Sequence, residues 1–375
     1  MFHVKQADGE AGSAEDVFHV KHVGPQGPGC AVVGVMPCSR VESLTRGPGT
    51  GRMAFVDRLL RFHPPTAVCA AESELRSMES DESGSGADGG EHGVKMPNNL
   101  SDAEAVVEGA RPISAERPLP RIIAVANQKG GVGKTTTSIN LSACLAELGY
   151  RTLVIDLDPQ GNASTGLGVD IRSLESSMYD VILHDVPLED CIEGTVVRNL
   201  FVAPASLDLA GAEIELVPAF SREMRLKMAI DSVKDDYDFV LIDCPPSLGL
   251  LTVNAMAAAT EVLVPIQCEY FALEGLTQLT KNVALIQKSL NPALEISAIV
   301  LVMYARTNLS DGVVADVREH FGDKVCQEVV PRSVRLSEAP GFGQPIITFD
   351  PSSRGATAYR KLAKEVSGGT PQRTR

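Results

Sequence analysis

The stretch Asn127-Gln-Lys-Gly-Gly-Val-Gly-Lys-Thr-Thr136 follows directly on the apolar run Ile122–Ala126. A buried strand that leads through a glycine-rich turn into a helix is the local architecture of a phosphate-binding loop. The glycines allow backbone N–H groups to converge on phosphate oxygens, and the following helix adds the positive end of its dipole. In such a loop Lys134 reaches the β- and γ-phosphates of a nucleotide, and the Thr135 hydroxyl ligates Mg²⁺.

The generic pattern places glycine five residues before Gly133, where this chain has Gln128. A plain glycine-rich turn with a surface lysine is therefore the simpler interpretation. The order of elements favours the phosphate-binding loop, because the strand and the loop precede an amphipathic helix predicted over Thr135–Leu148 and stopped by Gly149.

The string Lys129–Thr136 resembles the deviant P-loop of the ParA/MinD family of ATPases. In that family the first lysine reaches across a dimer interface to the phosphates of the partner's ATP. The resemblance implies ATP and Mg²⁺ as cofactors and Lys129 and Lys134 as catalytic residues. It also implies that ATP is held by Lys129, Gly130, Gly131, Val132, Gly133, Lys134, Thr135 and Thr136.

Composition narrows the class of protein. A chain of 375 residues with 44% hydrophobic content can bury a large core. Its sequence shows no apolar run of about 18 residues and no basic-then-apolar leader, so we expect neither a membrane span nor export. The eight cysteines form no C-x-x-C pair, which fits buried thiols in a reducing cytosol. The lack of tryptophan argues against a base-stacking surface.

The formal net charge of −14 argues against nucleic acid as a partner of the whole surface. Residues 1–120 hold 11 basic and 17 acidic side chains, and the remainder holds 23 and 31. Both parts are therefore acidic, and any contact with DNA must come from a local patch.

The chain divides into two main parts of unequal character. Residues 1–120 lack a sustained period and include the low-complexity stretch 81–90, so we expect a mostly disordered or non-native extension. We expect the ATPase domain over residues 121–367 and a flexible tail over 368–375.

The N-terminal part repeats Phe-His-Val-Lys at residues 2–5 and 18–21. These four residues can be encoded by TTTCACGTGAAA, which is its own reverse complement and resembles parS, the DNA site read by ParB proteins. We therefore hypothesise that two such sites lie in this part of the reading frame, and that translation begins later, at Met53 or Met96.

From Arg121 onward, apolar runs alternate with helical patterns, which predicts a doubly wound, mostly parallel sheet flanked by helices. The predicted strands are 122–126, 152–156, 200–204, 239–243, 262–266, 296–303 and 327–330. The predicted helices after the first are 223–233, 252–259, 276–290 and 312–321. In this fold the ligand lies beyond the carboxyl ends of the strands.

Carboxylates stand at two of these strand ends. Asp156 and Asp158 follow one strand and Asp243 ends another. Helix capping is the commoner role for such an aspartate, but an upstream P-loop favours a Mg²⁺ site and a water-orienting carboxylate. The resemblance implies that Asp158 orients the attacking water, that Asp156 supports it, and that Asp243 holds the metal through water.

The C-terminal third is similar to the chromosomal ParA proteins, the Soj group, over Ala305–Leu309, Val330–Pro340, Pro265–Gly275 and Asp350–Ala356. The similarity implies non-specific DNA contacts through Arg306, Arg332 and Arg335 once ATP has closed the dimer. Surface ion pairing is an equally good account of any one of these arginines.

The resemblance thus implies a chromosome-partitioning ATPase that is cytoplasmic and nucleoid-associated. An ATP-dependent homodimer would hold non-specific DNA and hydrolyse ATP slowly until stimulated by a ParB-type centromere-binding protein. The alternative is a MinD-like membrane-cycling ATPase, but residues 364–375 offer no apolar face for lipid. Metabolic or redox enzymes of this fold need cysteine ligands or a substrate domain, and the sequence shows neither.

Overall fold

The computed structural model describes residues 2–6, 17–24, 27–35, 113, 117–269 and 272–369, and it divides the chain into units 1–93 and 94–375. In the first unit, β1 (Phe2–Gln6), β2 (Val17–Gly24) and β3 (Gly27–Val35) form an antiparallel sheet. The two Phe-His-Val-Lys repeats pair with each other, with Val4 opposite Val20. The predicted disorder over the rest of residues 1–112, and in residues 370–375, falls outside the described residues.

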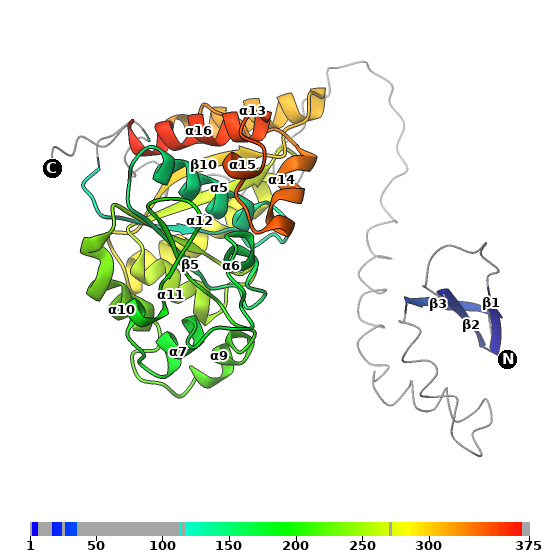
Figure 1. The fold of residues 1–375 in the computed structure, drawn as a ribbon. Helices are drawn as coiled ribbons and strands as arrows, with labels where there is room; N and C mark the ends of the chain where they lie inside the picture. Colours follow the sequence, from blue (N-terminus) through cyan, green and yellow to red (C-terminus); the bar gives the residue numbers. More distant parts are fainter. Residues whose placement is uncertain are drawn as a thin grey trace. The chain divides into compact units, whose positions relative to one another are not determined.

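The second unit is built on a seven-stranded sheet in the order β10-β9-β4-β8-β5-β7-β6 (Figure 1). Every neighbouring pair is parallel except β6 and β7, so the predicted mostly parallel sheet is confirmed. The strands are β4 (Arg121–Val125), β5 (Thr152–Asp156), β6 (Glu193–Gly194), β7 (Leu200–Ala203), β8 (Phe239–Asp243), β9 (Glu261–Gln267) and β10 (Glu295–Val302).

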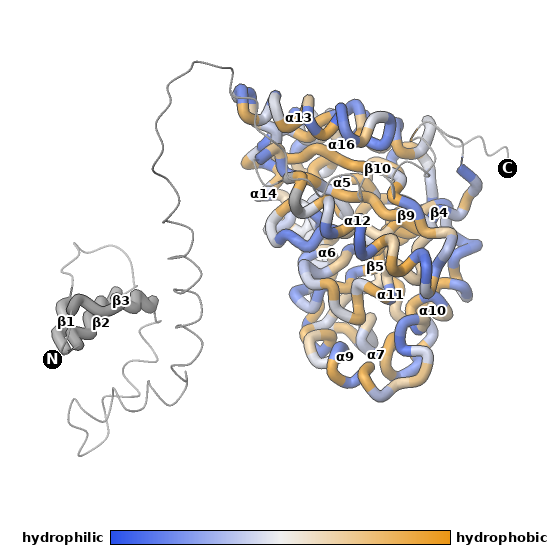
Figure 2. The backbone as a smooth tube through the Cα atoms, turned by 180° about the vertical axis from the view of Figure 1, so that it is seen from behind, coloured by the Kyte–Doolittle hydropathy of each residue, from blue (hydrophilic) through white to orange (hydrophobic). Residues whose placement is uncertain are grey.

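Helices cover both faces of this sheet. Successive strand residues point to opposite sides, and here both sets are apolar, so each face needs a covering layer. Ile122 and Ala124 belong to one buried cluster, and Ile123 and Val125 belong to the other. The residues of β4, β9 and β10 are predominantly hydrophobic (Figure 2). The first face is covered by α7 (Met178–Leu183), α8 (Leu188–Cys191), α9 (Leu209–Glu215), α10 (Arg225–Val233), α11 (Leu250–Ala258), α12 (Ala272–Ser289) and α13 (Asn308–Phe321). The second face is covered by α5 (Lys134–Glu147), α6 (Asn162–Gly166), α14 (Val334–Glu338), α15 (Ile346–Phe349) and α16 (Arg354–Ser367).

The helix that follows the glycine-rich loop is not the amphipathic helix that we predicted. Eleven of the 14 residues of α5 are buried, because α16 packs on the side of α5 that faces away from the sheet. A polar contact between the two helices is buried as well, with 3.2 Å between Thr137 Oγ1 and Tyr359 OH. The predicted stop is confirmed, since Gly149 takes a φ of 103° directly after the C-cap residue Leu148.

The prediction of a strand over 327–330 is wrong. This segment runs beside β10 but bonds to it only at intervals, through Cys326 N to Ile299 O at 2.9 Å and Val330 N to Leu301 O at 2.9 Å. The bridges Ile299–Val325 and Tyr304–Pro331 are isolated. Two bonds of this kind do not make a continuous ladder, so the sheet ends at β10.

The end of the sheet opposite the glycine-rich loop is closed by buried charges. Arg121 Nε donates to Glu261 Oε1 at 2.7 Å, and Arg117 Nη1 lies 3.0 Å from Glu261 Oε2. A second arginine nitrogen, Arg117 Nη2, lies 3.3 Å from Glu295 Oε1. The folded domain therefore includes Arg117, four residues before the predicted boundary at 121. Within the described residues, no helix is long and apolar enough to cross a membrane.

Candidate nucleotide-binding site

Three strand ends meet at one edge of the sheet. The glycine-rich loop leaves β4 between β8 and β9, and Asp156 at the end of β5 is in register with Asp243 at the end of β8. The carboxylates and the loop that were far apart in the sequence are thus neighbours, as the parallel sheet predicts.

The loop is held in shape by polar contacts to β9. Asn127 is buried; its Nδ2 donates to Pro265 O at 2.8 Å and its Oδ1 accepts from Lys129 N at 3.0 Å. Gln267 Nε2 donates to Gly131 O at 3.1 Å. Gly131 and Gly133 take φ values of +73° and +81°, which favour glycine, and Gly133 caps α5 without a side chain. These contacts and φ values hold the loop in its shape without a ligand.

Lys134 is buried at the start of α5, and its Nζ donates to Lys129 O at 3.3 Å. Burial lowers the pKa of Lys134, and the nearby carboxylate of Asp243 opposes that shift, with smaller contributions from Cys244 and Asp158. A buried ammonium whose hydrogen bond goes to a loop carbonyl gains most from an anion placed in the loop.

Asp243 is fully buried at the edge where a cation would sit. Its Oδ1 accepts from Ser138 Oγ at 2.7 Å. Its Oδ2 is buried and accepts no hydrogen bond from the described residues. Burial raises the pKa of Asp243 to about 7, with a further contribution from Asp156, while the hydroxyls of Ser138 and Thr135 favour the charged form. An unsatisfied buried carboxylate oxygen beside a hydroxyl suits a hard, oxygen-loving cation such as Mg²⁺.

Asp156 serves the backbone rather than a ligand. Its Oδ2 accepts from Ser164 N at 2.8 Å and from Ser164 Oγ at 2.7 Å, and its Oδ1 accepts from Asp158 N at 3.1 Å. Burial raises the pKa of Asp156 to about 6. Both oxygens are engaged, so Asp156 holds the turn that carries Asp158, and its supporting role in hydrolysis stays a prediction.

Asp158 is only half-buried. Its Oδ1 accepts from Gln160 N at 3.0 Å, within the turn itself. Its charge makes a small contribution that raises the pKa of Lys134. Such a group can accept a hydrogen bond from a water near the phosphates.

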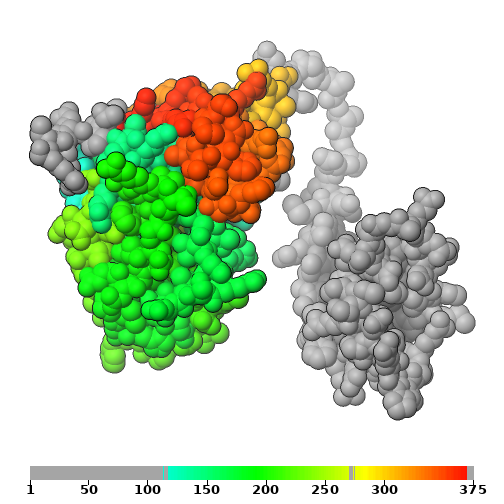
Figure 3. All heavy atoms as spheres, in the orientation of Figure 1, coloured from blue at the N-terminus to red at the C-terminus, as the bar shows by residue number. Residues whose placement is uncertain are grey.

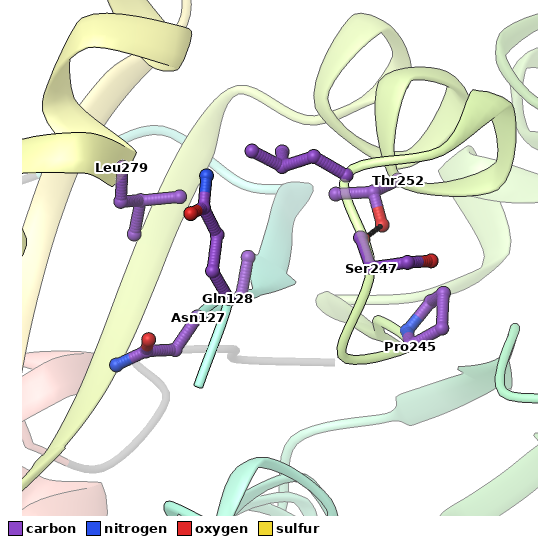
Figure 4. A pocket seen from close by; sticks show the side chains of 8 residues that line it. Asn127, Gln128, Pro245, Ser247, Thr252 and Leu279 are labelled. Carbon is purple, nitrogen blue, oxygen red and sulfur yellow. Dashed lines mark hydrogen bonds between the residues drawn. The ribbon is translucent and has the colours of Figure 1, made fainter. Parts of the chain in front are cut away.

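A small hollow opens beside the loop, between the segment after Asp243 and α12 (Figure 4). Gln128 extends into it toward Leu279 and Thr252, so the residue that breaks the generic P-loop pattern is part of its wall. Thr252 Oγ1 donates to Ser247 O at 2.6 Å and holds the opposite wall. The hollow is lined by Ala126, Asn127, Gln128, Pro245, Ser247, Leu248, Thr252 and Leu279.

Lys129 differs from Lys134 in its exposure and in its partner. Its side chain is 41% exposed, and its Nζ lies 3.7 Å from Glu269 Oε2, a weak surface pair. A Cβ added at the adjacent Gly130 would meet nothing within 4 Å among the described residues. The front of the loop is thus open, and the predicted reach of Lys129 into a second subunit stays a prediction.

The three predicted DNA-binding arginines are all exposed. The backbones of their segments meet, because Arg332 N donates to Tyr304 O at 2.9 Å, two residues before Arg306. Arg335 also takes part in surface ion pairs, at 3.1 Å from Glu338 and 3.5 Å from Asp350. The ion-pair account thus holds for Arg335 in this state of the protein, and contact with DNA stays a prediction.

The residues at this edge fit a nucleotide with its metal ion. Lys134, the loop and the start of α5 form a cationic cradle, and Thr135 and Asp243 provide oxygens for the cation. Ser138, Asn127 and Ser164 complete the site, and the sequence reading missed them. Ser138 could have been found, because it lies one helical turn beyond Lys134 on the same face of α5.

Comparison with known proteins also indicates a nucleotide-binding protein. A family model described as an AAA domain matches residues 120–296. The chain is 57% identical to the sporulation initiation inhibitor protein Soj of Bacillus subtilis over 248 residues, covering 66% of this chain and 98% of that protein. It is 54% identical to the chromosome partitioning protein ParA of Caulobacter vibrioides, covering 66% and 93%.

Solved structures share the fold. A cobyrinic acid a,c-diamide synthase from Mycobacterium smegmatis with bound ATP analog and magnesium is 39% identical, with a TM-score of 0.58 over 65% of this chain and 93% of that one. The septum site-determining protein MinD of Pyrococcus horikoshii, complexed with Mg-ADP, is 32% identical, with a TM-score of 0.55 over 66% and 95%. With more than half of its residues identical to Soj across nearly all of that protein, the chain belongs to the Soj/ParA family of chromosome-partitioning ATPases.

Proposed function

We propose that this chain partitions chromosomes through an ATP-dependent homodimer that holds non-specific DNA and releases it on hydrolysis. The contrast between the two loop lysines supports this proposal. Lys134 is buried and belongs to its own subunit's cradle, whereas Lys129 is exposed and held only by a weak ion pair. A second subunit placed against the open front of the loop would bring its own Lys129 to this nucleotide.

Within the site each residue has a separate task. Mg²⁺, when bound, neutralises charge on the phosphates. Lys134 and the loop N–H groups bind the phosphates, and Thr135 and Asp243 hold the cation. Asp156 fixes the turn of Asp158, and Asp158 orients the water that attacks the terminal phosphate. Slow turnover is expected in the isolated protein, because the partner's Lys129 arrives only in the dimer.

DNA binding is compatible with the acidic total charge if it depends on a shared patch. Arg306, Arg332 and Arg335 lie on segments that meet beside β10, and a dimer would present two such sets. A few phosphate contacts per subunit are then enough, and binding falls steeply with salt. We further propose that a ParB-type centromere-binding protein stimulates hydrolysis, and that the protein resides on the nucleoid in the cytoplasm.

The alternative is a MinD-like protein that cycles on membranes. The similarity to MinD is real, at 32% identity, but identity to Soj and ParA is higher, at 57% and 54%. Flotation with anionic liposomes, compared with retention on DNA, separates the two functions. ATP-dependent flotation without DNA retention would favour the MinD-like alternative.

The decisive experiment is DNA binding by the wild type and by Arg335→Ala, with ATP and with ADP. We expect ATP-dependent binding by the wild type, about tenfold weaker binding by the variant, and a salt slope reduced by about one per lost phosphate contact. Lys361→Ala is the matched control, because Lys361 is similarly exposed and also ion-paired, at 3.3 Å from Glu328. Equal binding by Arg335→Ala and Lys361→Ala would remove Arg335 from the DNA site.

A further inference from the structure

Ser138 joins the helix that begins in the phosphate-binding loop to the strand that ends at Asp243. It is fully buried in α5, one helical turn beyond Lys134. Its Oγ donates to Asp243 Oδ1 at 2.7 Å, and Lys134 O lies 3.1 Å from the same Oγ. A hydroxyl carries one proton, and a carboxylate is a stronger acceptor than a peptide carbonyl, so this proton goes to Asp243.

The bond orients a carboxylate whose backbone is already held. The strand β8 pairs with β4 on one side and with β5 on the other, up to Asp243 itself. Rotation of the carboxylate about its last side-chain bond is nevertheless soft. Among the described residues, Ser138 donates to Oδ1 and no donor reaches the buried Oδ2. The hydroxyl of Ser138 therefore determines which oxygen of Asp243 is left for a cation.

Bulk water cannot replace the hydroxyl of Ser138 as the donor. Ser138 and Asp243 are both fully buried. The side of α5 that faces away from the sheet is covered by α16. In Figure 3 the orange and red C-terminal residues form a continuous layer on the face of the molecule that is shown. Removal of the hydroxyl should therefore leave Oδ1 without its donor and allow the carboxylate to turn.

We propose that Ser138 is a positioning residue, whose hydroxyl keeps Oδ2 of Asp243 available to Mg²⁺ and gives the site a preference for Mg²⁺ over Ca²⁺. It rests on the proposed function, in which Thr135 and Asp243 hold the cation, whereas Ser138 acts only through Asp243. Mg²⁺ requires a nearly ideal octahedron of ligands, and Ca²⁺ accepts variable geometry. A carboxylate that can turn should therefore weaken the binding of Mg²⁺ more than the binding of Ca²⁺.

The same helix provides a matched control. Ser142 lies one turn farther along α5 and is also fully buried, and its Oγ donates to Ile139 O at 2.9 Å. Ser142→Ala removes a buried hydroxyl, as Ser138→Ala does, but it leaves Asp243 with its donor. Alanine favours the helix, so both variants should fold. If Ser138 only ties the structure together, the two variants should behave alike.

The test measures by calorimetry the affinity of the full-length chain for ADP in EDTA, in Mg²⁺ and in Ca²⁺. The gain in ADP affinity that a cation gives reports how well the protein–ADP complex holds that cation, because free ADP binds the cation equally in every experiment. In Ser138→Ala the gain from Mg²⁺ should fall about tenfold or more, and the gain from Ca²⁺ should fall less. The affinity in EDTA should stay at the wild-type value. Ser142→Ala should match the wild type in all three solutions.

Three results would overturn the positioning role. They are wild-type gains in Ser138→Ala, an equal fall of the Mg²⁺ and Ca²⁺ gains, and a loss of ADP affinity in EDTA. The comparison of the two gains is decisive, because both cations compete with the same proton on Asp243 and any change in its ionisation cancels.

Asp243→Asn separates this inference from the proposed function. This variant should lose the gain from Mg²⁺ at least as strongly as Ser138→Ala. If Asp243→Asn keeps the wild-type gain, Asp243 does not hold the cation, and the proposed function fails at that step. If Asp243→Asn loses the gain and Ser138→Ala does not, only the role of Ser138 is wrong.

Discussion

At the scale of a single residue, Asp243 has two properties that oppose each other. It is fully buried, which disfavours its charge, and it stands where a Mg²⁺ ion requires that charge. Asp156, in register on the neighbouring strand, adds a second buried carboxylate. Without a cation Asp243 is therefore only partly ionised at neutral pH, and binding of the cation should release its proton.

Proton release provides the first prediction. Because burial raises the pKa of Asp243 to about 7, loading Mg·ADP at pH 7 should release about half a proton, and less at pH 8.5, where the carboxylate is already ionised. Calorimetry in two buffers of different ionisation enthalpy measures this number. Asp243→Asn should abolish the release. Identical heats in both buffers at pH 7 would contradict the assignment.

Asp158 can be tested against a residue of the same local geometry. Asp158→Ala should leave nucleotide binding intact but slow hydrolysis by roughly two orders of magnitude or more, which traps the ATP dimer on DNA. Asp170→Ala is the matched control, because Asp170 Oδ1 accepts from Arg172 N at 3.1 Å in an equivalent turn. Phosphate release and DNA retention are the measurements, and rapid turnover by Asp158→Ala would exclude the role.

At the scale of elements, the predicted strands 152–156 and 239–243 match β5 and β8 residue for residue, because a continuous apolar run ends at an aspartate in both. The strand predicted over 327–330 rests on only two valines and has no aspartate at its end, and the structure shows isolated bridges there in place of a continuous ladder. The pattern of α5 was misread, since its outer side is covered by α16, a helix more than two hundred residues away. Long-range packing therefore decided what local periodicity could not.

The glycine-rich loop gives a prediction at this scale. A Cβ at Gly130 meets nothing within 4 Å among the described residues, so Gly130→Val should fold and bind nucleotide normally. A second loop facing this one would be crowded, and the ATP-dependent dimer should be lost. Sedimentation with and without ATP measures this difference. Gly312→Val on α13 is the control, since its Cβ is equally free, and a stable ATP dimer of Gly130→Val would refute the facing-loop arrangement.

At the scale of the whole molecule, stability depends on charges buried at the far end of the sheet. Burial raises the pKa of Glu261, but hydrogen bonds and charge from Arg121, with Arg117, outweigh it, and the pKa lies below its ordinary value of 4.5. Because the folded pKa is depressed, the stabilisation is present above about pH 4.5 and is lost as the pH falls through the folded value.

Glu261→Gln should therefore reduce the free energy of unfolding at pH 7, and the difference from the wild type should shrink below pH 4. Urea denaturation across this range measures both. Glu147→Gln is a control, because Glu147 pairs with Arg360 at 2.7 Å on the exposed surface, where the effect should be small. An equal loss at pH 7 and at pH 3.5 would show that Glu261 contributes through packing alone.

The last described residues are held at the end of the sheet that lies opposite the nucleotide site. Arg121 Nη1 donates to Val366 O, and Tyr150 OH donates to Gly369 O at 3.1 Å, so α16 ends at the sheet edge opposite the nucleotide. A fluorescent protein joined beyond this point would stand a full strand length from the loop that we expect to face a second subunit. Live-cell imaging with such a fusion should follow the protein's movement without blocking its assembly.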